Sequence, residues 1–409
     1  MKRKLEIDGE FEKAYPVLKK IWEADFEAYY VGGSVRDRLL GLEVNDIDIA
    51  TSALPEEIKE IFNRTVDVGI EHGTVLVLTS NREYEITTFR TESTYKDFRR
   101  PESVTFVRSL EEDLKRRDFT MNAIAMDEEG KLHDPYHGLT DIEKETIRAV
   151  GNPYERFNED ALRMMRAVRF AAQLDFQIEA ETLDSIRENA ALLEKIAVER
   201  IQIEFEKLLL SSWRAEGLEA MLETGLYYYC PNLPSRKEAL EALIQDKLVF
   251  KDPESAWAML IYQIDKNEKG FKERKFLVHW KLSNKMIQQA QTLFTALKKR
   301  VVSSTLDSLE IFNLGKDTAL KVENLMEHLG KESKKEEVKE IYKSLLIKNK
   351  NQLAISGHDL MKVSPVKAGP WLGTALNEAL RAVVYKKVSN EKEIIINYLK
   401  EIDKIPGLV

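Results

Sequence analysis

Asp46 and Asp48 stand one residue apart in a run that alternates acidic and apolar side chains, Asp46-Ile47-Asp48-Ile49-Ala50. This alternation predicts a β-strand over 46–50, with both carboxylates on one face and the isoleucines turned into the core. Carboxylates placed so close together repel one another, unless they share divalent cations, which oxygen ligands of this kind bind well. The other interpretation is a solvated surface pair, and the spacing alone does not decide between the two.

A third carboxylate, Glu85, can join this pair. The run Tyr84-Glu85-Ile86-Thr87 predicts another strand, in which Tyr84 and Ile86 are buried and Glu85 lies on the face of the aspartates. Three carboxylates from two strands form a plausible cradle for two Mg²⁺ ions. We therefore expect Asp46, Asp48 and Glu85 to be catalytic, and Asp46 and Asp48 to bind the metal.

A glycine turn precedes the aspartates by about fifteen residues. Val31-Gly32-Gly33-Ser34 follows a predicted strand over 28–31 and opens a predicted helix over 35–40. Glycines allow the backbone to approach a phosphate, and the free N–H groups of a helix start favour an anion. Arg36 can reach a triphosphate from the first helical turn. Alternatively, Ser34 is only a helix cap and Arg36 only a salt-bridge partner of Asp37. Together, a phosphate-binding turn and a carboxylate pair favour nucleotidyl transfer.

The elements that must hold these residues fall into two parts. Over about the first 130 residues, short β-branched runs alternate with helical patterns. Helix is predicted at 55–62 and strand at 73–78 and 84–89. The polar segment 90–101 has no periodicity and is predicted to be a loop without secondary structure. From about Asn158 onward the pattern is nearly continuous helix, with predicted helices over 160–174, 180–193 and 198–210.

Composition limits the possible classes of protein. A length of 409 residues predicts two to four domains. No apolar run approaches the roughly 20 residues of a membrane span, and no signal peptide is predicted, so we expect a cytoplasmic protein with no membrane partner. Cys230 is the only cysteine, which excludes an intrachain disulfide and argues against a zinc cluster. The net charge of −8 argues against non-specific coating by nucleic acid. The segment 266–300, with ten basic and two acidic residues, could follow an RNA backbone or be a solvated helical face.

Five motifs occur in order along the chain and resemble those of class II tRNA nucleotidyltransferases, the bacterial-type CCA-adding enzymes. This family belongs to the superfamily that also contains DNA polymerase β and the bacterial poly(A) polymerases. The motifs are Gly32-Gly33-Ser34-Val35-Arg36-Asp37, Asp46-Ile47-Asp48-Ile49-Ala50, Glu85-Ile86-Thr87-Thr88-Phe89-Arg90, Arg116-Arg117-Asp118-Phe119-Thr120-Met121-Asn122-Ala123 and Glu159-Asp160-Ala161-Leu162-Arg163. The resemblance implies an α+β fold, with a polymerase-β-like nucleotidyltransferase head of mixed sheet and helices over 1–145. An all-helical neck over 146–210, body over 211–325 and tail over 326–409 would follow it.

The resemblance also implies which residues bind ATP or CTP. They are Gly33, Arg36, Arg117, Asp160, Arg163, Arg166 and Arg169. In the family, the Arg116-Arg117-Asp118 motif reads the ribose; the alternative is that these basic residues only close a helix against its dipole.

In the family, Asp160 and Arg163 pair with the Watson–Crick edge of the incoming nucleotide. Asp only accepts and Arg only donates, which suits the amino group and ring nitrogen of C and A and mismatches U and G. The alternative for Asp160 and Arg163 is an ordinary ion pair on one face of the predicted helix over 160–174. Arg166 and Arg169 would hold phosphates or flank the base.

The activity implied by the resemblance is addition and repair of the 3′-terminal CCA of tRNA from CTP and ATP, with release of pyrophosphate. It would use two Mg²⁺ ions, tRNA as partner, and a monomer or homodimer. Asp97-Phe98-Arg99-Arg100-Pro101 matches the family's flexible loop and favours CCA addition over CC-only addition. A poly(A) polymerase is a rival, but 62–69 departs from the basic segment typical of those enzymes. An inactive RNA-binding paralogue is another, and the intact Asp46 and Asp48 argue against it.

Overall fold

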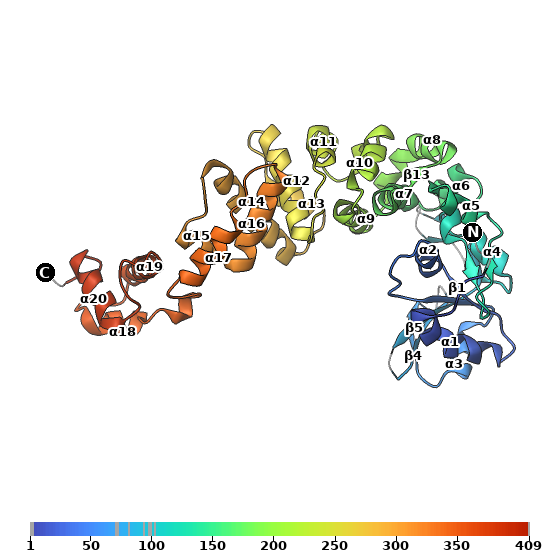
Figure 1. The fold of residues 1–409 in the computed structure, drawn as a ribbon, viewed down its shortest axis with the longest axis horizontal. Coiled ribbons are helices and arrows are strands. Elements are labelled where there is room, and N and C mark those ends of the chain that lie inside the picture. The colour runs from blue at the N-terminus through green and yellow to red at the C-terminus, as the bar shows by residue number, and fades with distance from the viewer. Residues whose placement is uncertain are drawn as a thin grey trace. The chain divides into compact units, whose positions relative to one another are not determined.

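The computed structural model describes residues 4–69, 73–80, 82–92, 95–96, 100–101 and 104–407. The chain divides into two compact units, Met1–Gln245 with Lys275–Leu282, and Asp246–Arg274 with Ser283–Val409. Figure 1 shows the strands of the large sheet in the first unit, in blue to green, and only helices among the labelled elements of the second. Within the described residues, none of the helices is long and apolar enough to span a bilayer.

A seven-stranded mixed sheet lies at the centre of the head, in the order β11-β10-β1-β2-β5-β4-β3. All neighbouring strands are antiparallel except β2 and β5, which are parallel. The mixed sheet confirms the predicted α+β class, although the edge strand β3 was not predicted. The strands are β1 (Ala28–Val31), β2 (Asp48–Thr51), β3 (Thr65–Gly69), β4 (Thr74–Leu78), β5 (Glu83–Thr88), β10 (Ala125–Met126) and β11 (Leu132–His133).

The strand predicted over 46–50 begins two residues later, at Asp48. The register explains this: Val31, the last residue of β1, lies opposite Asp48, and the chain then leaves the sheet at Gly32. An earlier residue of β2 would face helix α2 instead of a strand. Asp46 therefore precedes the strand, and the prediction that one strand carries both aspartates is wrong.

Helices pack on the sheet and close the head. On α1, Phe11 contacts Tyr30 of β1 edge to face, with ring centroids 5.0 Å apart, and its carbonyl accepts the Tyr30 hydroxyl at 2.9 Å. Tyr84 and Ile86 of β5 are buried, as predicted. The helices are α1 (Gly9–Trp22), α2 (Gly33–Leu39), α3 (Pro55–Ile61), α4 (Leu110–Lys115), the short 3₁₀ helix η2 (Thr120–Asn122) and α5 (Gly138–Glu143).

Small two-stranded sheets accompany the large one. The predicted loop over 90–101 is in part strand: β6 (Arg90–Glu92) pairs with β9 (Val104–Phe106), and β7 (Tyr95–Lys96) with β8 (Arg100–Pro101). Pairing between segments distant in sequence uses backbone groups, which apolar periodicity does not report. Asp97, Phe98 and Arg99, central to the predicted flexible loop, lie outside the described residues. The third pair is β12 (Thr146–Ile147) with β13 (Gln177–Ile178).

The rest of the first unit is helical. Helix α7 packs against α9 and α10. Gly217 of α10 permits this approach, because a Cβ there would lie 2.4 Å from the carbonyl oxygen of Val168. The helix predicted over 160–174 begins at Leu162, since Asp160 is extended and its carboxylate accepts the Leu162 N–H at 3.0 Å. The helices are α6 (Pro153–Glu159), α7 (Leu162–Leu174), α8 (Ala180–Asn189), α9 (Val198–Leu210), α10 (Arg214–Glu223), α11 (Lys237–Gln245) and α13 (Glu273–His279), whose first two residues belong to the second unit.

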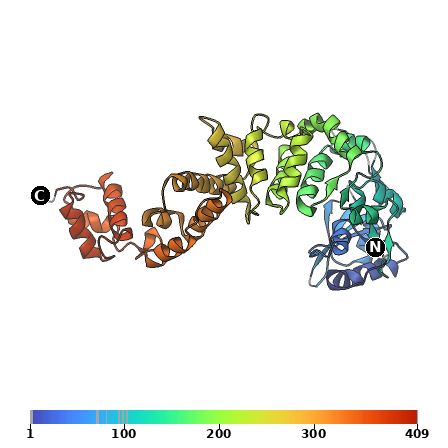
Figure 2. The same cartoon turned by 45° about the horizontal axis from the view of Figure 1, so that its top comes forward.

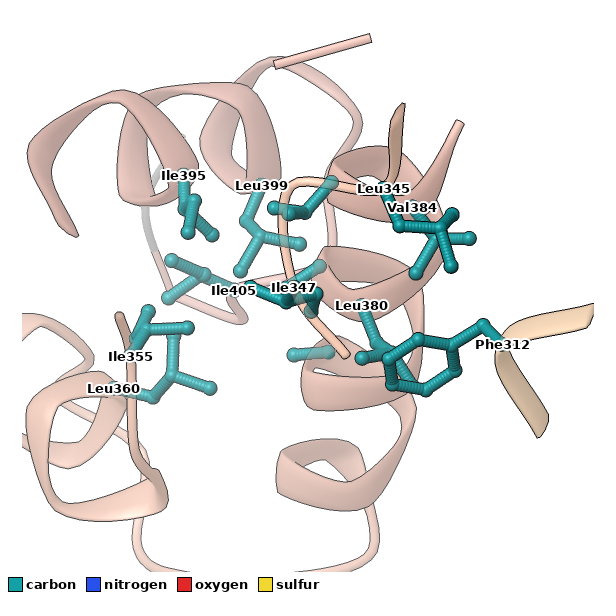
Figure 3. Packing of buried hydrophobic residues seen from close by; sticks show 13 residues of the cluster. Phe312, Leu345, Ile347, Ile355, Leu360, Leu380, Val384, Ile395, Leu399 and Ile405 are labelled. Carbon is teal, nitrogen blue, oxygen red and sulfur yellow. The ribbon is translucent and has the colours of Figure 1, made fainter. Parts of the chain in front are cut away.

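The second unit has two well-packed parts. Helices α14 and α16 are joined by a buried ion pair, Arg300 Nε to Glu323 Oε1 at 2.6 Å. Further along the chain, a cluster that includes Leu360, Leu380 and Ile395 forms a compact apolar core (Figure 3). The helices, yellow to red in Figures 1 and 2, are α12 (Pro253–Asn267), α14 (Asn284–Val302), α15 (Ser308–Leu314), α16 (Lys316–His328), α17 (Lys335–Ser344), α18 (Gly357–Val363), α19 (Trp371–Val384) and α20 (Lys392–Glu401).

Candidate active site

A cavity of about 1280 Å³ in the first unit lies between the head and the helices that follow it. Glu85 is not among the residues that line it. The lining includes every other residue predicted from the sequence: Gly33, Arg36, Asp46, Asp48, Arg117, Asp160, Arg163, Arg166 and Arg169. Side chains separated by more than a hundred residues thus share one polar cavity.

The glycine turn forms part of the cavity wall. Gly32 has a φ of 71°, which favours glycine, and a Cβ there would lie 3.0 Å from Arg117 Nη1 and 3.7 Å from Asp48 Oδ2. The Ser34 hydroxyl donates to the Val31 carbonyl at 3.0 Å, so it ties the turn to β1. The turn therefore brings bare backbone next to an arginine and a carboxylate.

The carboxylates lie where β2 and β5 run side by side. Asp48 begins β2 and is in register with Glu85 of β5. Desolvation raises the pKa of the Asp48 carboxyl, Arg117 opposes this, and the negative charges of Glu85 and Asp46 raise it further. Within the described residues, no three His, Cys, Asp or Glu side chains converge closely enough to bind one metal ion. Carboxylate oxygens such as those of Asp46 and Asp48 are ligands that fit a divalent cation.

A buried acid holds the two arginines of the ribose motif. The Asp113 carboxylate binds Arg116 Nη2 at 2.8 Å and Arg117 Nη2 at 3.2 Å. Burial opposes ionisation, but the two guanidinium groups outweigh it and lower the pKa of Asp113. The Nε of Arg117 is buried, and no hydrogen-bond partner for it occurs among the residues that the structure describes. Arg117 is thus anchored at one edge beside the glycine turn.

Asp160 and Arg163 each have another partner in this structure. Asp160 binds Arg200 of α9 through both carboxylate oxygens, at 3.3 and 2.7 Å. Arg163 binds Glu159 at 3.1 Å and donates to the carbonyl of Arg116 at 2.9 Å. The predicted i, i+3 placement on one helix is therefore wrong, because Asp160 precedes α7. Both residues still line the same cavity.

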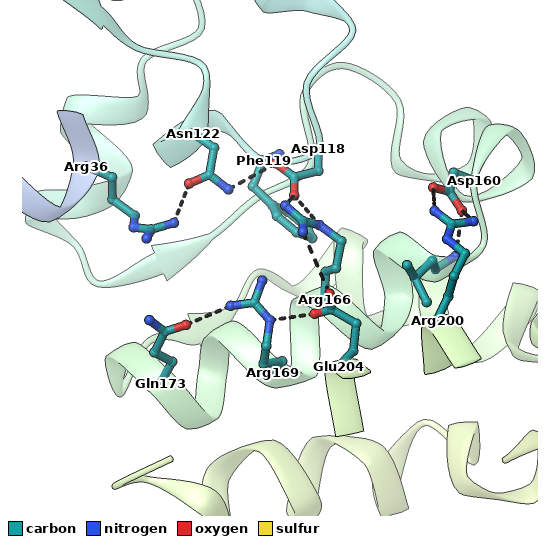
Figure 4. A network of polar contacts seen from close by, with 11 residues as sticks. Arg36, Asp118, Phe119, Asn122, Asp160, Arg166, Arg169, Gln173, Arg200 and Glu204 are labelled. Atoms are coloured by element: carbon teal, nitrogen blue, oxygen red, sulfur yellow. Dashed lines mark hydrogen bonds and ion pairs between the residues drawn. The ribbon is translucent and has the colours of Figure 1, made fainter. Parts of the chain in front are cut away.

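The remaining neck arginines are held by buried acids (Figure 4). Arg166 Nε donates to Asp118 at 2.7 Å, and Arg169 Nε donates to Glu204 at 2.5 Å. Burial opposes the ionisation of Asp118, but Arg166 and the Asn122 amide outweigh it and hold its pKa well below the usual range.

Several partners of the predicted residues were not predicted from the sequence, among them Asp113, Asn122, Gln173, Arg200 and Glu204. The sequence offered one signal for the last two. Arg200 and Glu204 lie one turn apart on the helix predicted over 198–210, and the structure buries Glu204.

Comparison with known protein families identifies the head as a nucleotidyltransferase domain. The model of the Poly A polymerase head domain matches residues 28–148. The family described as "Probable RNA and SrmB- binding site of polymerase A" matches 175–235, and tRNA nucleotidyltransferase domain 2 matches 248–399. Nucleotidyltransferases of this kind use divalent metal ions.

Whole-chain comparisons narrow this class. The chain is 50% identical over 396 residues to the CCA-adding enzyme of Enterococcus faecalis, covering 97% of each chain. It is 49% identical over 400 residues to that of Limosilactobacillus fermentum, covering 97% of this chain and 98% of the relative. The crystal structure of the Bacillus stearothermophilus CCA-adding enzyme in complex with CTP is 42% identical, with a TM-score of 0.90, covering 97% of this chain and 98% of that one. The chain belongs to the family of CCA-adding enzymes, which are tRNA nucleotidyltransferases.

Proposed function

We propose that this protein adds and repairs the 3′-terminal CCA of tRNA, using CTP and ATP and releasing pyrophosphate, without a nucleic-acid template. The observation that carries the proposal is the single cavity that unites the glycine turn, the Asp46 and Asp48 carboxylates and the neck residues Asp160 and Arg163. Kinship with CCA-adding enzymes along the whole chain supports the same conclusion.

Asp46 and Asp48 are proposed to hold two Mg²⁺ ions. Bound there, such ions would activate the RNA 3′-hydroxyl and neutralise charge on the α-phosphate and on the leaving pyrophosphate. Burial, together with the negative charges of Glu85 and Asp46, raises the pKa of Asp48. This supports the assignment, because a bound cation would stabilise the ionised carboxylate. Glu85 is proposed to act beside Asp48, its neighbour across the two strands.

The triphosphate is proposed to lie along the glycine turn. Gly33 offers backbone without a side chain in the way, and Arg36 and Arg117 line the same part of the cavity. Arg117, next to Gly32 and Asp48, is placed to contact the ribose or the phosphates. Arg166 and Arg169 are proposed to flank the nucleotide from the side of α7.

Base choice is proposed to rest on Asp160 and Arg163. The carboxylate of Asp160 has further lone pairs although Arg200 and the Leu162 N–H use some, and a guanidinium carries five donors. An acceptor beside a donor matches the amino group and ring nitrogen of C and of A. U and G present the reverse order and would leave both side chains mispaired, which costs several kcal/mol in a desolvated site.

Primer extension on tRNA that ends before the CCA tests this function. With each nucleotide supplied separately, CTP alone should add two residues and ATP should add one only after them. Addition of A alone would indicate a poly(A) polymerase, and arrest after two C would indicate a CC-only enzyme. Incorporation of U as readily as C would overturn the proposed role of Asp160 and Arg163.

Several predictions stay untested. They are the domain boundaries at 145, 210 and 325, a monomer or homodimer, and a cytoplasmic location. The two compact units are a coarser division, in which the head and the helices up to Gln245 belong together.

A further inference from the structure

Asn122 lies between two charged groups of the cavity, and neither the proposed metal site nor the proposed base contacts use it. Its Oδ1 accepts a hydrogen bond from Arg36 Nη1 at 2.6 Å, and its Nδ2 donates to Asp118 Oδ1 at 3.0 Å (Figure 4). The side chain is buried, at 6% exposure. One amide thus touches both the helix after the glycine turn and the acid that holds the neck.

Chemistry determines the orientation of this amide. A guanidinium only donates, so Arg36 must face the amide oxygen, and an ionised carboxylate only accepts, so Asp118 must face the amide NH₂. An aspartate at this position would satisfy Arg36 and oppose Asp118, and a leucine would satisfy neither. Asparagine is therefore the residue of this size that meets both requirements.

The backbone that carries Asn122 is firmly held. In η2, the Thr120 hydroxyl donates to Asp141 at 2.7 Å. Helix α5 packs so closely that a Cβ on Gly138 would lie 2.2 Å from the carbonyl oxygen of Thr120. Such packing leaves little freedom for the amide to follow a displaced partner.

Both partners of Asn122, Asp118 and Arg36, contact residues of α7. Asp118 Oδ2 accepts from Arg166 Nε at 2.7 Å. The Arg36 guanidinium lies 4.9 Å from the ring centroid of Phe170, and Arg166 lies 5.4 Å from that same centroid. Arg36 and Arg166 are therefore spaced by Asn122 and Asp118 on one side and by Phe170 on the other.

We propose that Asn122 is a positioning residue for the nucleoside triphosphate: it holds Arg36 and, through Asp118, Arg166 at a fixed separation. The two arginines can then contact the nucleotide at the same time, Arg36 from the head and Arg166 from α7. Neither has to reorganise when the nucleotide binds. The inference rests on the proposed function, because it takes a nucleoside triphosphate as the ligand.

The test compares Asn122→Leu with Asn189→Leu in the full-length protein. Asn189, on α8, is equally buried, and its amide donates to the Ser185 carbonyl at 2.9 Å, outside the cavity lining. We expect Asn122→Leu to raise KM for CTP and for ATP about tenfold, as for the loss of one hydrogen bond to a charged group, with a smaller change in kcat. Asn189→Leu should lower Tm to a similar extent and leave KM unchanged. Equal KM values for the two variants would overturn the proposal.

Asn122→Asp provides a nearly isosteric second variant. It keeps the acceptor for Arg36 and places a second carboxylate against Asp118, so KM should rise at least as much as in Asn122→Leu. Wild-type KM in Asn122→Asp would overturn the proposal, even if Asn122→Leu fails to fold.

A double-mutant cycle with Arg166→Gln tests the route through Asp118. Once Arg166 is absent, Asn122→Leu should raise KM by much less than tenfold, and fully additive effects would contradict that route.

Calorimetric titration with CTP, in the absence of RNA, separates the proposed role of Asn122 from the proposed function. Unaltered CTP binding by Asn122→Leu overturns the role of Asn122, whereas a wild type that binds CTP but extends no tRNA overturns the function.

Discussion

The head side and the neck side of the cavity differ in how their acidic side chains are neutralised. On the head side, burial raises the pKa of Asp48, Arg117 opposes the rise, and the negative charges of Glu85 and Asp46 add to it. On the neck side, Asp160 is paired with Arg200, Arg166 with Asp118 and Arg169 with Glu204. The acids on the neck side are neutralised by their own arginine partners, whereas the divalent cations proposed to bind on the head side would neutralise the carboxylates there.

The difference separates two tasks of one site. Compensated pairs hold their geometry without a ligand, which suits groups that must discriminate between bases. Uncompensated carboxylates bind and release metal with the substrate, which suits the group transfer. We expect substitutions on the head side to lower kcat strongly. Substitutions on the neck side should change the stability of the fold or the selectivity for the base.

The largest effect is expected from Asp48→Asn. Loss of a metal ligand should lower kcat by about 10³-fold, measured as pyrophosphate release with Mg²⁺. Because the change also relieves like-charge repulsion, Tm should stay the same or rise. Asp67→Asn, which alters a carboxylate of β3 that pairs with Lys59 outside the cavity lining, is the comparison for a general loss of negative charge. Normal turnover by Asp48→Asn in Mg²⁺ would contradict the metal assignment.

Asp118→Asn should break the compensation on the neck side and lower the free energy of unfolding by about 3 kcal/mol at pH 7, because Arg166 loses its buried partner. The folded-state pKa of Asp118 is depressed, so its contribution is present above the unfolded pKa of about 3.9 and is lost as pH falls toward the folded pKa.

Urea titrations of wild type and Asp118→Asn at pH 7, 5 and 3 measure this effect. The gap between the two should be nearly constant from pH 7 to 5 and should shrink at pH 3 and below. A gap that widens on acidification would contradict the depressed pKa.

Arg163→Ala is expected to reduce base discrimination by about 10²-fold, or roughly 3 kcal/mol, because it removes the donor that we propose pairs with the ring nitrogen of the base. The measurement is kcat/KM for CTP against UTP, and for ATP against GTP, on matched tRNA ends. Arg187→Ala, on α8 with an exposed ion pair to Glu223, is the control and should leave both ratios unchanged. An equal loss for all four nucleotides would indicate a triphosphate contact instead.

The smallest of these effects is expected from Arg200→Gln. Asp160 would keep the hydrogen bond from the Leu162 N–H and lose its bidentate partner, so the ratio of CTP to UTP should fall about tenfold with little change in Tm. Rescue by Arg200→Lys should be incomplete, since a lysine cannot bind both oxygens in the same plane. Unchanged discrimination would show that Asp160 needs no partner to hold its position.

Parts of the head and neck could be predicted from short-range patterns. The strand over 28–31 and the helix over 198–210 match the structure residue for residue, because their apolar spacing persists over the whole element. The helix predicted from Asp160 begins at Leu162 instead, because Asp160 is extended and its carboxylate accepts the N–H of Leu162 in the first turn. The strand pairing within 90–101 was missed because it depends on partner segments, which local composition does not reveal.

The sequence by itself determined the chemistry of this protein: the glycines of the turn, the aspartates beside it, and the order of the motifs that identify the family. These properties belong to single residues and their near neighbours, so they can be read without a fold. Only the tertiary structure decided which polar side chains pair with one another. Arg36 forms a hydrogen bond with Asn122, 86 residues away in the sequence, and Asp160 forms an ion pair with Arg200, 40 residues away. Such pairs form because packing brings distant elements to one cavity, where a buried charge must be compensated by whatever lies within reach.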